Sequence, residues 1–325
     1  MYIEPKSAIT LLKRNPSLYG NPVSFEVVEE FERAICESEY AIDVIRNDGI
    51  LLPKFYKLAY IKLRVPFYSS SICTKSKKSI FSIQMGPDFG KILPLINRYE
   101  NVYAYFFDIW PNFFDEMELF LKNIPVSQVF LSSANAVNYF RNKGFLNLTW
   151  IPEGVSSKSY MYSSYKNKDI DVLELGRKHK HIHNTIAEIL RTKHKTHLFE
   201  KKPGEIIFST TEEFVSGMAR SKISLCFPKN ETHPDVAGSI STMTNRYLQS
   251  MASKCLVVGS APQEMIQLFG YNPVIQINFS DPARHLLEIL DTYEDYHSLI
   301  EKNYQNVIRN HTWESRWKSI LETIK

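Results

Sequence analysis

Paired cysteines, long apolar runs and an excess of one charge are all missing from this chain of 325 residues. Its four cysteines, Cys36, Cys73, Cys226 and Cys255, are scattered and form no Cys-x-x-Cys pair, which excludes a disulfide framework. Cys226 and Cys255 lie in the apolar runs "ISLCFP" and "KCLVVG", where a thiol behaves as a small buried hydrophobic group. The pattern indicates a chain from a reducing compartment, and we expect a cytoplasmic location.

No apolar stretch approaches the roughly 18 residues that cross a bilayer. The start of the chain, "MYIEPKSAITLLKRNPS", also lacks the basic beginning and continuous apolar core of a signal peptide. The segments "KFYKLAYIKLRVPFY" and "TKSKKS" mix cations with aromatic residues. Two interpretations of them stay open: a peripheral contact with anionic lipid at the inner face of a membrane, and a solvated strand edge.

Positive and negative charges nearly balance one another, with 39 basic and 35 acidic residues and a net charge of +4. A dedicated nucleic-acid-binding protein usually has a clearly basic domain, so we expect no nucleic acid partner. The mild positive excess suits a protein that binds one compact anion. With 44% hydrophobic residues the chain can bury a core, and its length corresponds to about two domains.

The first half of the sequence predicts an α/β domain with parallel strands. The segment "SFEVVEEFERAICES" places apolar residues at helical spacing with acids on the other face. Further along, short strand-like runs alternate with helical segments, as in the units that build a parallel sheet. We expect strands within 57–65, 79–86, 101–110 and 127–133, and helices within 24–38, 115–124 and 134–144.

A domain boundary is expected near "LTWIPEGVSSKSYMYSSYKNKD", where proline, glycine and clustered serines interrupt the pattern. Beyond it, the alternation predicts a second doubly wound domain, in which a ligand binds at the carboxyl ends of the strands. The loops after Gly176, Pro228 and Gly259 are therefore candidate ligand-binding loops. We expect strands within 170–176, 205–210, 222–228, 255–260 and 274–279, and helices within 183–194, 211–221, 245–254, 261–270 and from 281 onward.

The segment "VLELGRKHKHIHNT" is the first of these loops. Gly176 permits a tight turn, and Arg177 and Lys178 follow it at the start of a helix, where free N–H groups and the helix dipole favour anions. Arginine can bind a phosphate through two donors, and lysine adds a point charge. A basic turn that is only solvated is the alternative.

The histidines of this segment also raise a metal site as an alternative. On a helix only His179 and His183 would share a face, and no cysteine, aspartate or glutamate nearby in the sequence completes a tetrahedral set. We therefore expect no metal here, and we expect His194 and His197 at the surface. A nucleic-acid patch is disfavoured as well, because no aromatic residues accompany the charge.

The segment "TNRYLQSMASKCLVVGSAPQE" contains the second candidate site. Thr244 and Asn245 can cap the helix that follows. Arg246 and Gln249 are three residues apart, so both can point at one ligand. For Arg246 and Gln249 the alternative is a solvent-facing position.

These motifs are similar to those of a known family. The C-terminal half resembles the donor-binding domain of GT-B glycosyltransferases, in particular the bacterial family 4-like enzymes (glycosyl transferases group 1) of cell-surface polysaccharide assembly. "WIPEGVSSKSY" looks like the interdomain connection, "VLELGRKHK" like the phosphate-binding turn, and "MARSKISLCFP" like the step that ends in proline. "MTNRYLQSMASKCLVVGSAPQEM" resembles the signature helix and "NHTWESRW" the C-terminal helix. In the N-terminal half only "FFDIWP" and "VFLSSANAVNYF" are suggestive.

The resemblance implies an α/β fold of the GT-B type, with two facing Rossmann-like domains. It implies an acceptor-binding domain at 1–150, a nucleotide-sugar-binding domain at 151–305, and a C-terminal helix at 306–325 that packs back on the first domain.

One departure concerns the two glutamates, eight residues apart, that such enzymes typically carry. The second position is Gln249 here, which can bind a ribose hydroxyl only without charge, and the first is Ser241. Glu231, His233 and Asp235 in the preceding loop are the open choices for a substitute.

The resemblance further implies a nucleotide-diphosphate sugar as donor and a glycan or lipid-linked acceptor, with retention of configuration favoured. Arg177 and a lysine, Lys178 or Lys180, would neutralise the leaving diphosphate. Asp108, after an apolar strand, would be the base or the partner of the acceptor hydroxyl; its alternative is a helix cap or turn. The residues expected to bind the donor are Gly176, Lys180, His233, Thr244, Asn245, Arg246 and Gln249. No metal or other cofactor is expected.

Two other functions remain open at the level of sequence. A sugar-nucleotide epimerase of the same fold would share the nucleotide site. A non-catalytic, glycosyltransferase-like partner subunit would explain the glutamine at position 249.

Overall fold

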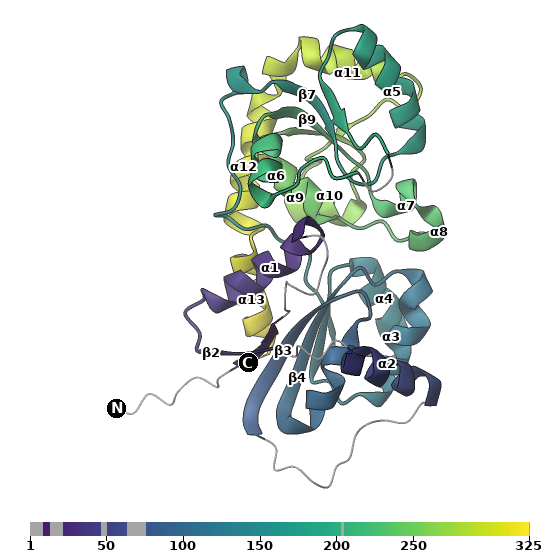
Figure 1. The fold of residues 1–325 in the computed structure, drawn as a ribbon, viewed down its shortest axis with the longest axis vertical. Helices are drawn as coiled ribbons and strands as arrows, with labels where there is room; N and C mark the ends of the chain where they lie inside the picture. Colours follow the sequence, from purple (N-terminus) through teal and green to yellow (C-terminus); the bar gives the residue numbers. More distant parts are fainter. Residues whose placement is uncertain (1–8, 14–21, 47–50, 64–75, 203–204, 325) are drawn as a thin grey trace. The chain divides into compact units, whose positions relative to one another are not determined.

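The computed structural model describes residues 9–13, 22–46, 51–63, 76–202 and 205–324. Two compact units divide the chain, one made of Met1–Pro152 with Arg316–Lys325 and the other of Glu153–Ser315. Each unit is built on its own parallel sheet, with helices on both faces (Figure 1). Cys73 and the 64–75 part of the cation-rich segments considered above lie outside the described residues.

The sheet of the first unit has the strand order β2-β1-β3-β4-β5-β6, and each neighbouring pair is parallel. β2 pairs on one side of β1, and β3 to β6 follow in sequence on its other side. The direction in which strands are added therefore reverses between β1 and β3, as in doubly wound folds. The strands are β1 (Ile9–Lys13), β2 (Ile42–Arg46), β3 (Ser76–Met85), β4 (Tyr99–Phe107), β5 (Gln128–Leu131) and β6 (Leu148–Trp150).

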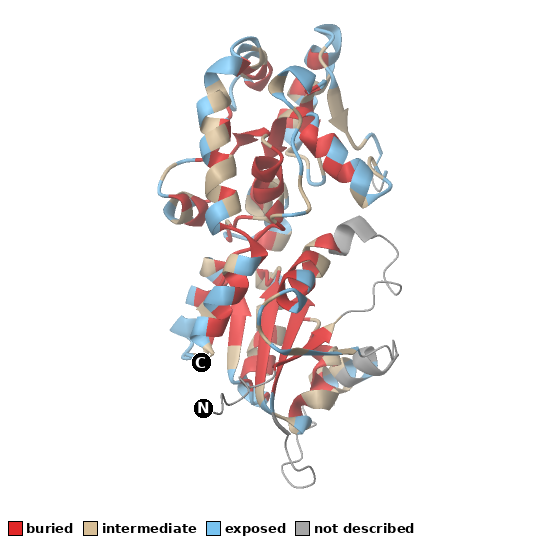
Figure 2. Cartoon of the chain, turned by 90° about the vertical axis from the view of Figure 1, so that its left-hand side faces the viewer, coloured by how far each residue is buried: buried red, intermediate tan, exposed pale blue. Residues whose placement is uncertain are grey.

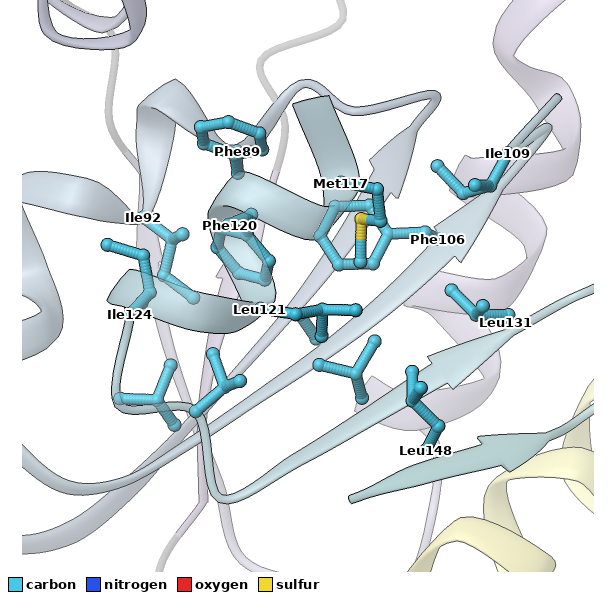
Figure 3. Close-up of a cluster of buried hydrophobic side chains, with 14 of the residues drawn as sticks. Phe89, Ile92, Phe106, Ile109, Met117, Phe120, Leu121, Ile124, Leu131 and Leu148 are labelled. Carbon is cyan, nitrogen blue, oxygen red and sulfur yellow. The ribbon is translucent and has the colours of Figure 1, made fainter. Parts of the chain in front are cut away.

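Both faces of this sheet are buried, as the red strands of Figure 2 show. Alternate residues of β4 face opposite sides, so Phe106 packs with Met117 and Phe120 (Figure 3), while Tyr105 contacts Phe31 at a ring distance of 5.2 Å. The first face is covered by α2 (Leu51–Leu63), α3 (Phe114–Asn123) and α4 (Ala134–Asn142), and the second by α1 (Pro22–Cys36) and α13 (Trp313–Thr323) (Figure 1).

The sheet of the second unit has the order β11-β10-β9-β7-β8, again parallel throughout, with its reversal between β7 and β9. Val172 of β7 packs with α5 and α11, whereas its neighbour Leu173 packs with α6. Val257 of β10 packs with α9 and α10 on that same second face. The strands are β7 (Ile170–Glu174), β8 (His197–Phe199), β9 (Ser221–Cys226), β10 (Leu256–Gly259) and β11 (Ile275–Gln276). The longer helices are α5 (Lys180–Thr192), α6 (Thr211–Ala219), α9 (Asn245–Ala252), α10 (Gln263–Phe269), α11 (Pro282–Asp291) and α12 (His297–Asn310).

Short helical turns occupy several connections. The polar loop expected after Pro228 contains α7 (Lys229–Thr232) and α8 (Pro234–Ala237). The 3₁₀ turns are η2 (Phe89–Lys91), η3 (Leu93–Arg98), η4 (Pro111–Phe113), η5 (Tyr165–Asn167) and η6 (Tyr293–Tyr296).

The strand predicted within 57–65 is wrong, because this segment belongs to α2, which ends at Leu63. In a strand, Leu58, Tyr60 and Lys62 would share one face. In the structure Leu58 and Lys62 are exposed, whereas Tyr60 is fully buried, stacks edge-on against Phe89 and donates its hydroxyl to the carbonyl of Leu119. The alternate residues 58, 60 and 62 are therefore not buried together, as one face of a half-buried strand would be.

The strand predicted within 205–210 is also wrong, since the edge strand of the second sheet is β8 at His197–Phe199. Backbone groups around the predicted strand bind side chains instead. The backbone N–H of Lys201 donates to Glu205, and that of Ser209 donates to Glu213. Cys226 and Cys255 are buried as predicted, and burial raises the pKa of Cys226 to about 11. In the described part of the chain, no helix combines the length and apolar character needed to cross a bilayer.

Candidate functional site

The three candidate ligand-binding loops, after Gly176, Pro228 and Gly259, follow β7, β9 and β10. These strands are neighbours in the second sheet. Their carboxyl ends therefore meet at one edge, as predicted. At Gly259, the last residue of β10, φ is 144°, and an added Cβ would overlap the carbonyl oxygen of Cys226. The N–H of Ser260 donates to that same oxygen at 3.1 Å. Close approach of two backbones thus requires glycine at this position.

Tyr247, near the start of α9, lies where these loops converge. Its hydroxyl donates to the carbonyl of Ser260 at 2.7 Å. Burial raises the pKa of Tyr247 well above its ordinary value, and the positive charge of Arg177 partly opposes that rise. Arg177 is therefore within electrostatic reach of the base of α9, and its own side chain is exposed. The turn after β7 and the start of α9 thus both lie near the carboxyl edge of the second sheet.

The turn after β7 has the geometry expected for a tight connection. Gly176 has φ 79°, and an added Cβ would meet no described atom within 4 Å, so conformation alone favours glycine here. His179 is the N-cap of α5, and its Nδ1 accepts a hydrogen bond from the N–H of Ile182 at 3.5 Å. Burial lowers the pKa of His179, which favours the neutral ring that can accept this bond. The ring lies 4.9 Å from that of Phe227 at the end of β9.

Of the two lysines of this turn, Lys178 is held by other contacts. The ammonium of Lys178 donates to the carbonyl of Glu200 at 2.5 Å and lies 5.4 Å from the ring of Phe199, on the β8 side of the sheet. Lys180, the first residue of α5, is exposed. The structure therefore does not bring Arg177 and Lys178 together on one ligand.

At the N-terminus of α9, the expected cap does not form through Thr244. Thr244 is the N-cap residue, but its side chain makes no capping hydrogen bond to any described residue. The carboxylate of Glu153 accepts from the N–H of Asn245 at 2.5 Å instead. Glu264 accepts from the N–H of Met243 at 2.8 Å. Both carboxylates are buried, and sequence reasoning missed both, although "WIPEGV" places Glu153 between apolar and turn residues in a connection already singled out.

The side chain of Asn245 is 8% exposed, and neither its Nδ2 nor its Oδ1 has a hydrogen-bond partner among the described residues. An amide without partners is costly to bury, because each of its donors and acceptors has given up water. Asn245 is therefore the group in this region that most needs a polar ligand.

Arg246 and Gln249 share a face of α9, as their spacing predicted. The guanidinium of Arg246 lies 5.0 Å from the ring of Phe214, and Nε2 of Gln249 donates to the hydroxyl of Tyr160 at 2.7 Å. The rings of Phe214 and Tyr160 are themselves 6.3 Å apart. Gln249 is buried, so the alternative of a solvent-facing glutamine is wrong.

The loop that was expected to supply a substitute for the missing glutamate is largely exposed. Glu231, His233 and Asp235 all have exposed side chains on α7, α8 and the residue between them. The charge of Glu231 acts on both Tyr247 and His179, which puts α7 within electrostatic reach of the strand ends. Ser241 is partly buried.

In the first unit, Asp108 directly follows β4 and has φ 53°, a left-handed conformation that is uncommon outside glycine. Beside it, Gly86 follows β3 with φ 59°, and its N–H donates to the carbonyl of Phe107 at 3.0 Å. Asp108 is partly exposed at the carboxyl edge of this sheet. The alternative of a helix cap does not apply, because the 3₁₀ turn that follows has Trp110 as its N-cap residue. The alternative of a turn does apply, since the carbonyl of Asp108 accepts a hydrogen bond from the N–H of Trp110 at 3.1 Å. Backbone strain of this kind concentrates at functional sites.

Two expectations about the histidines are wrong. A carboxylate does stand beside them, since Oε2 of Glu174 lies 2.5 Å from Nδ1 of His183. The side chain of His197 is 4% exposed and is not at the surface. His194 is exposed, as expected.

Comparison with known proteins agrees with this architecture. Residues 203–322 match a family model described as glycosyl transferase-like. No curated protein sequence matches the chain significantly.

Among solved structures, the chain is similar to Anabaena HepE in complex with UDP and glucose, with 10% identity, a TM-score of 0.58, and coverage of 98% of this chain and 99% of the other. It is similar to sucrose-phosphate synthase from Thermosynechococcus elongatus, with 11% identity, a TM-score of 0.59 and 98% coverage of each chain. It is also similar to UDP-GlcNAc 2-epimerase from Neisseria meningitidis bound to UDP-GlcNAc, with 9% identity, a TM-score of 0.52, and coverage of 98% and 99%. At these identities the likeness concerns the fold, and it confirms the predicted α/β architecture of the GT-B type.

Proposed function

We propose that this chain, which has the GT-B fold and a glycosyl transferase-like segment, is a glycosyltransferase that uses a nucleotide-diphosphate sugar. One observation carries the proposal. The carboxyl edge of the second sheet presents the exposed cation Arg177 in the turn after β7, and Asn245 at the start of α9 buries an amide that has no partner among the described residues. A diphosphate sugar offers the negative charge and the hydroxyl groups that these residues lack.

In this proposal the diphosphate lies between the turn at Gly176 and the start of α9. Arg177 neutralises the charge that grows on the leaving diphosphate, which lowers the energy of the transition state more than that of the ground state. The free N–H groups at the start of α5 add to the positive potential, and Lys180 lies on that first turn. Lys178 acts only if its side chain leaves the carbonyl of Glu200.

The sugar and ribose would be bound by the polar residues of α9 and its preceding loop. Asn245 donates to and accepts from sugar hydroxyls, and Gln249 holds a ribose hydroxyl together with Tyr160, to which it is already bonded. Thr244 and Arg246 flank them, and His233 approaches from α7 and α8.

For the acceptor, a glycan or lipid-linked sugar, we propose Asp108 as the base or the hydroxyl partner. Its left-handed backbone and partial exposure at the end of β4 support this role. We further propose hexosyl transfer with retention, without a metal at the diphosphate, in the assembly of a cell-surface polysaccharide such as lipopolysaccharide. The proposed location is the cytoplasm, peripherally at the membrane.

A thermal-shift screen with UDP-, GDP-, dTDP-, ADP- and CMP-sugars tests the donor site. One of these donors should raise the unfolding midpoint, and Arg177→Ala should weaken its binding by about 10- to 100-fold, the value of one charge-assisted phosphate contact. Arg220→Ala is the matched control. Arg220 is an exposed arginine that pairs with Asp169, and Asp169 lies directly before β7, at the opposite end of that strand from Arg177. An unchanged affinity in Arg177→Ala would refute the role of this residue.

A sugar-nucleotide epimerase is the second candidate, and the likeness to the Neisseria epimerase favours retaining it. Incubation with the preferred donor alone separates the two. A glycosyltransferase leaves the sugar unchanged until an acceptor is added, whereas an epimerase inverts one of its centres without acceptor. Binding of the donor with neither reaction, across a panel of glycan and lipid-linked acceptors, would instead indicate a non-catalytic partner subunit.

A further inference from the structure

Three side chains with metal-binding atoms meet at the β8 edge of the second sheet. Glu174 is the last residue of β7, His183 lies on the first turns of α5, and His197 begins β8. One potential ligand atom from each residue lies within 4.8 Å of the other two. Because α5 leaves β7 and the chain returns as β8 beside it, the fold itself closes this triangle.

The distances within the triangle suit a small cation. Nε2 of His197 lies 3.4 Å from Oε2 of Glu174, and tetrahedral zinc ligands with bonds of about 2.1 Å are also separated by about 3.4 Å. Nδ1 of His183 lies 2.5 Å from the same carboxylate oxygen, so a hydrogen bond with one proton between the two atoms joins them. A metal ion would replace that proton, and the two atoms would separate by about 0.9 Å.

Hydrogen bonding within the protein leaves this cluster incomplete. The side chains of Glu174 and His197 are 2% and 4% exposed. Yet Oε1 of Glu174 and both ring nitrogens of His197 have no hydrogen-bond partner in the parts of the chain that the structure describes. A neutral imidazole always carries one donor and one acceptor, so burying both without partners costs free energy. Coordination of an ion would satisfy Nε2 and the carboxylate at once.

The surroundings of the cluster leave room for one more ligand. His183 and His197 line a pocket of about 590 Å³, together with Phe199, whose ring lies 4.7 Å and 4.5 Å from the two imidazoles. Contacts of this kind hold the rings in place. Lys178, whose ammonium lies 5.4 Å from the ring of Phe199, is bonded to the carbonyl of Glu200. The pocket gives a fourth position access to water.

We propose that Glu174, His183 and His197 form a binding site for one divalent transition-metal ion, best matched by Zn²⁺. Two imidazoles and one carboxylate, without sulfur, form a ligand set that zinc prefers, and an open fourth position is taken by water. The ion joins the edge strand β8 and helix α5 to β7. Glu174 lies two residues before Gly176, so the ion also anchors the strand that ends in the proposed donor-binding turn. The site does not depend on the proposed function.

The test uses the full-length protein, stripped with a chelator and then exchanged into chelator-free buffer. On titration with ZnSO₄ we expect one zinc per chain by elemental analysis after gel filtration, and a higher unfolding midpoint. With Co²⁺ in place of zinc, we expect the intense visible absorption of a tetrahedral site.

Two variants and one control make the result specific. Glu174→Gln keeps the shape of the side chain and a hydrogen bond to His183, and His197→Ala removes one imidazole. Each should lower zinc affinity by at least about 100-fold, more than the loss of an outer-shell partner of a ligand. The control is His194→Asn. His194 is exposed, has φ 54° and lies between α5 and β8, so this variant should bind zinc as the unchanged protein does.

The unfolding midpoint in excess chelator shows whether each variant is folded. Zinc binding that is unaffected in both Glu174→Gln and His197→Ala would overturn the proposal and indicate adventitious binding to other histidines. The proposal also fails if the unchanged protein binds no zinc at micromolar concentration. Neither result would bear on the donor site, which is tested with Arg177→Ala.

Discussion

Gly259 is the residue at which the second sheet tolerates least change, because β10 and the end of β9 approach there without room for a side chain. We predict that Gly259→Ala lowers the free energy of unfolding by about 3 kcal/mol, since it adds a steric overlap with the carbonyl of Cys226 to the conformational strain at φ 144°. Urea unfolding followed by circular dichroism measures this loss.

The control is Gly270→Ala at the C-cap of α10. Gly270 has φ 74°, and an added Cβ meets no described atom within 4 Å. This variant therefore carries only the left-handed strain of about 1–2 kcal/mol. Equal losses in the two variants would show that the overlap at Gly259 is relieved by movement of the strands.

Single residues also show what local patterns could predict about the candidate site. The i, i+3 spacing placed Arg246 and Gln249 on one face of α9, and the strand-end rule placed Gly176 and Gly259 at one edge. Helical spacing and strand ends are local properties, so the sequence contains them. The backbone N–H of Asn245 donates to Glu153, 92 positions away, and its side-chain amide is buried without a partner among the described residues. No local pattern reports such a pair.

Among the elements of the second unit, α6 and α9 are joined at their C-terminal ends by one buried ammonium. Lys168 donates to the carbonyls of Ala219, Ser221 and Ser253 at 2.8, 2.9 and 3.2 Å. Ala219 ends α6 and Ser253 is the C-cap of α9, where the helix dipoles favour a cation. Burial lowers the pKa of Lys168, so these three bonds must offset the cost of removing the charge from water.

We predict that Lys168→Met lowers the free energy of unfolding by about 3 kcal/mol or more, because a methionine of similar length removes all three hydrogen bonds to these buried carbonyls. Lys166→Met, which changes an exposed lysine two residues earlier, should stay within about 0.5 kcal/mol of the unchanged protein. Chemical denaturation of both variants gives the comparison. A small loss in Lys168→Met would mean that water replaces the ammonium.

Prediction of the elements failed where a short segment was compatible with two structures. The segment 57–65 alternates well enough to suggest a strand, but in the structure Tyr60 contacts Phe89 and the carbonyl of Leu119 from a helix. At the edge of the second sheet, the strand predicted within 205–210 missed β8 at His197–Phe199, which has only three residues. His197, the third member of the histidine cluster, lies on this missed strand and was expected at the surface.

In the whole molecule, the first unit consists of two separate pieces of chain, since Arg316–Lys325 belong to it. The ring of Trp317 is buried 5.1 Å from that of Phe81, and its Nε1 donates to Ser38 at 3.3 Å. The end of the chain thus supplies part of the core of the first unit. By contrast, Glu153–Ser315 form the second unit as one continuous segment.

We predict that Trp317→Ala destabilises the first unit by about 3–5 kcal/mol, the cost of truncating a large buried aromatic residue. Donor binding by the second unit should be unchanged, because Trp317 belongs to the core of the first unit and the proposed donor-binding residues all belong to the second. Calorimetry should show one lowered transition and one unshifted transition that still responds to the donor. Leu146→Ala, at a side chain that is 82% exposed, is the control within the first unit.

The sequence alone determined the α/β class, the doubly wound pattern and the loops at which a ligand would bind, because hydrophobic period and turn residues are set by neighbours along the chain. Only the tertiary structure decided which carboxylates bind the start of α9, that Lys178 turns away from Arg177, and that Glu174, His183 and His197 meet. These contacts join residues on different elements, and their geometry depends on strand order and register. Neither quantity is encoded in the spacing of any single segment.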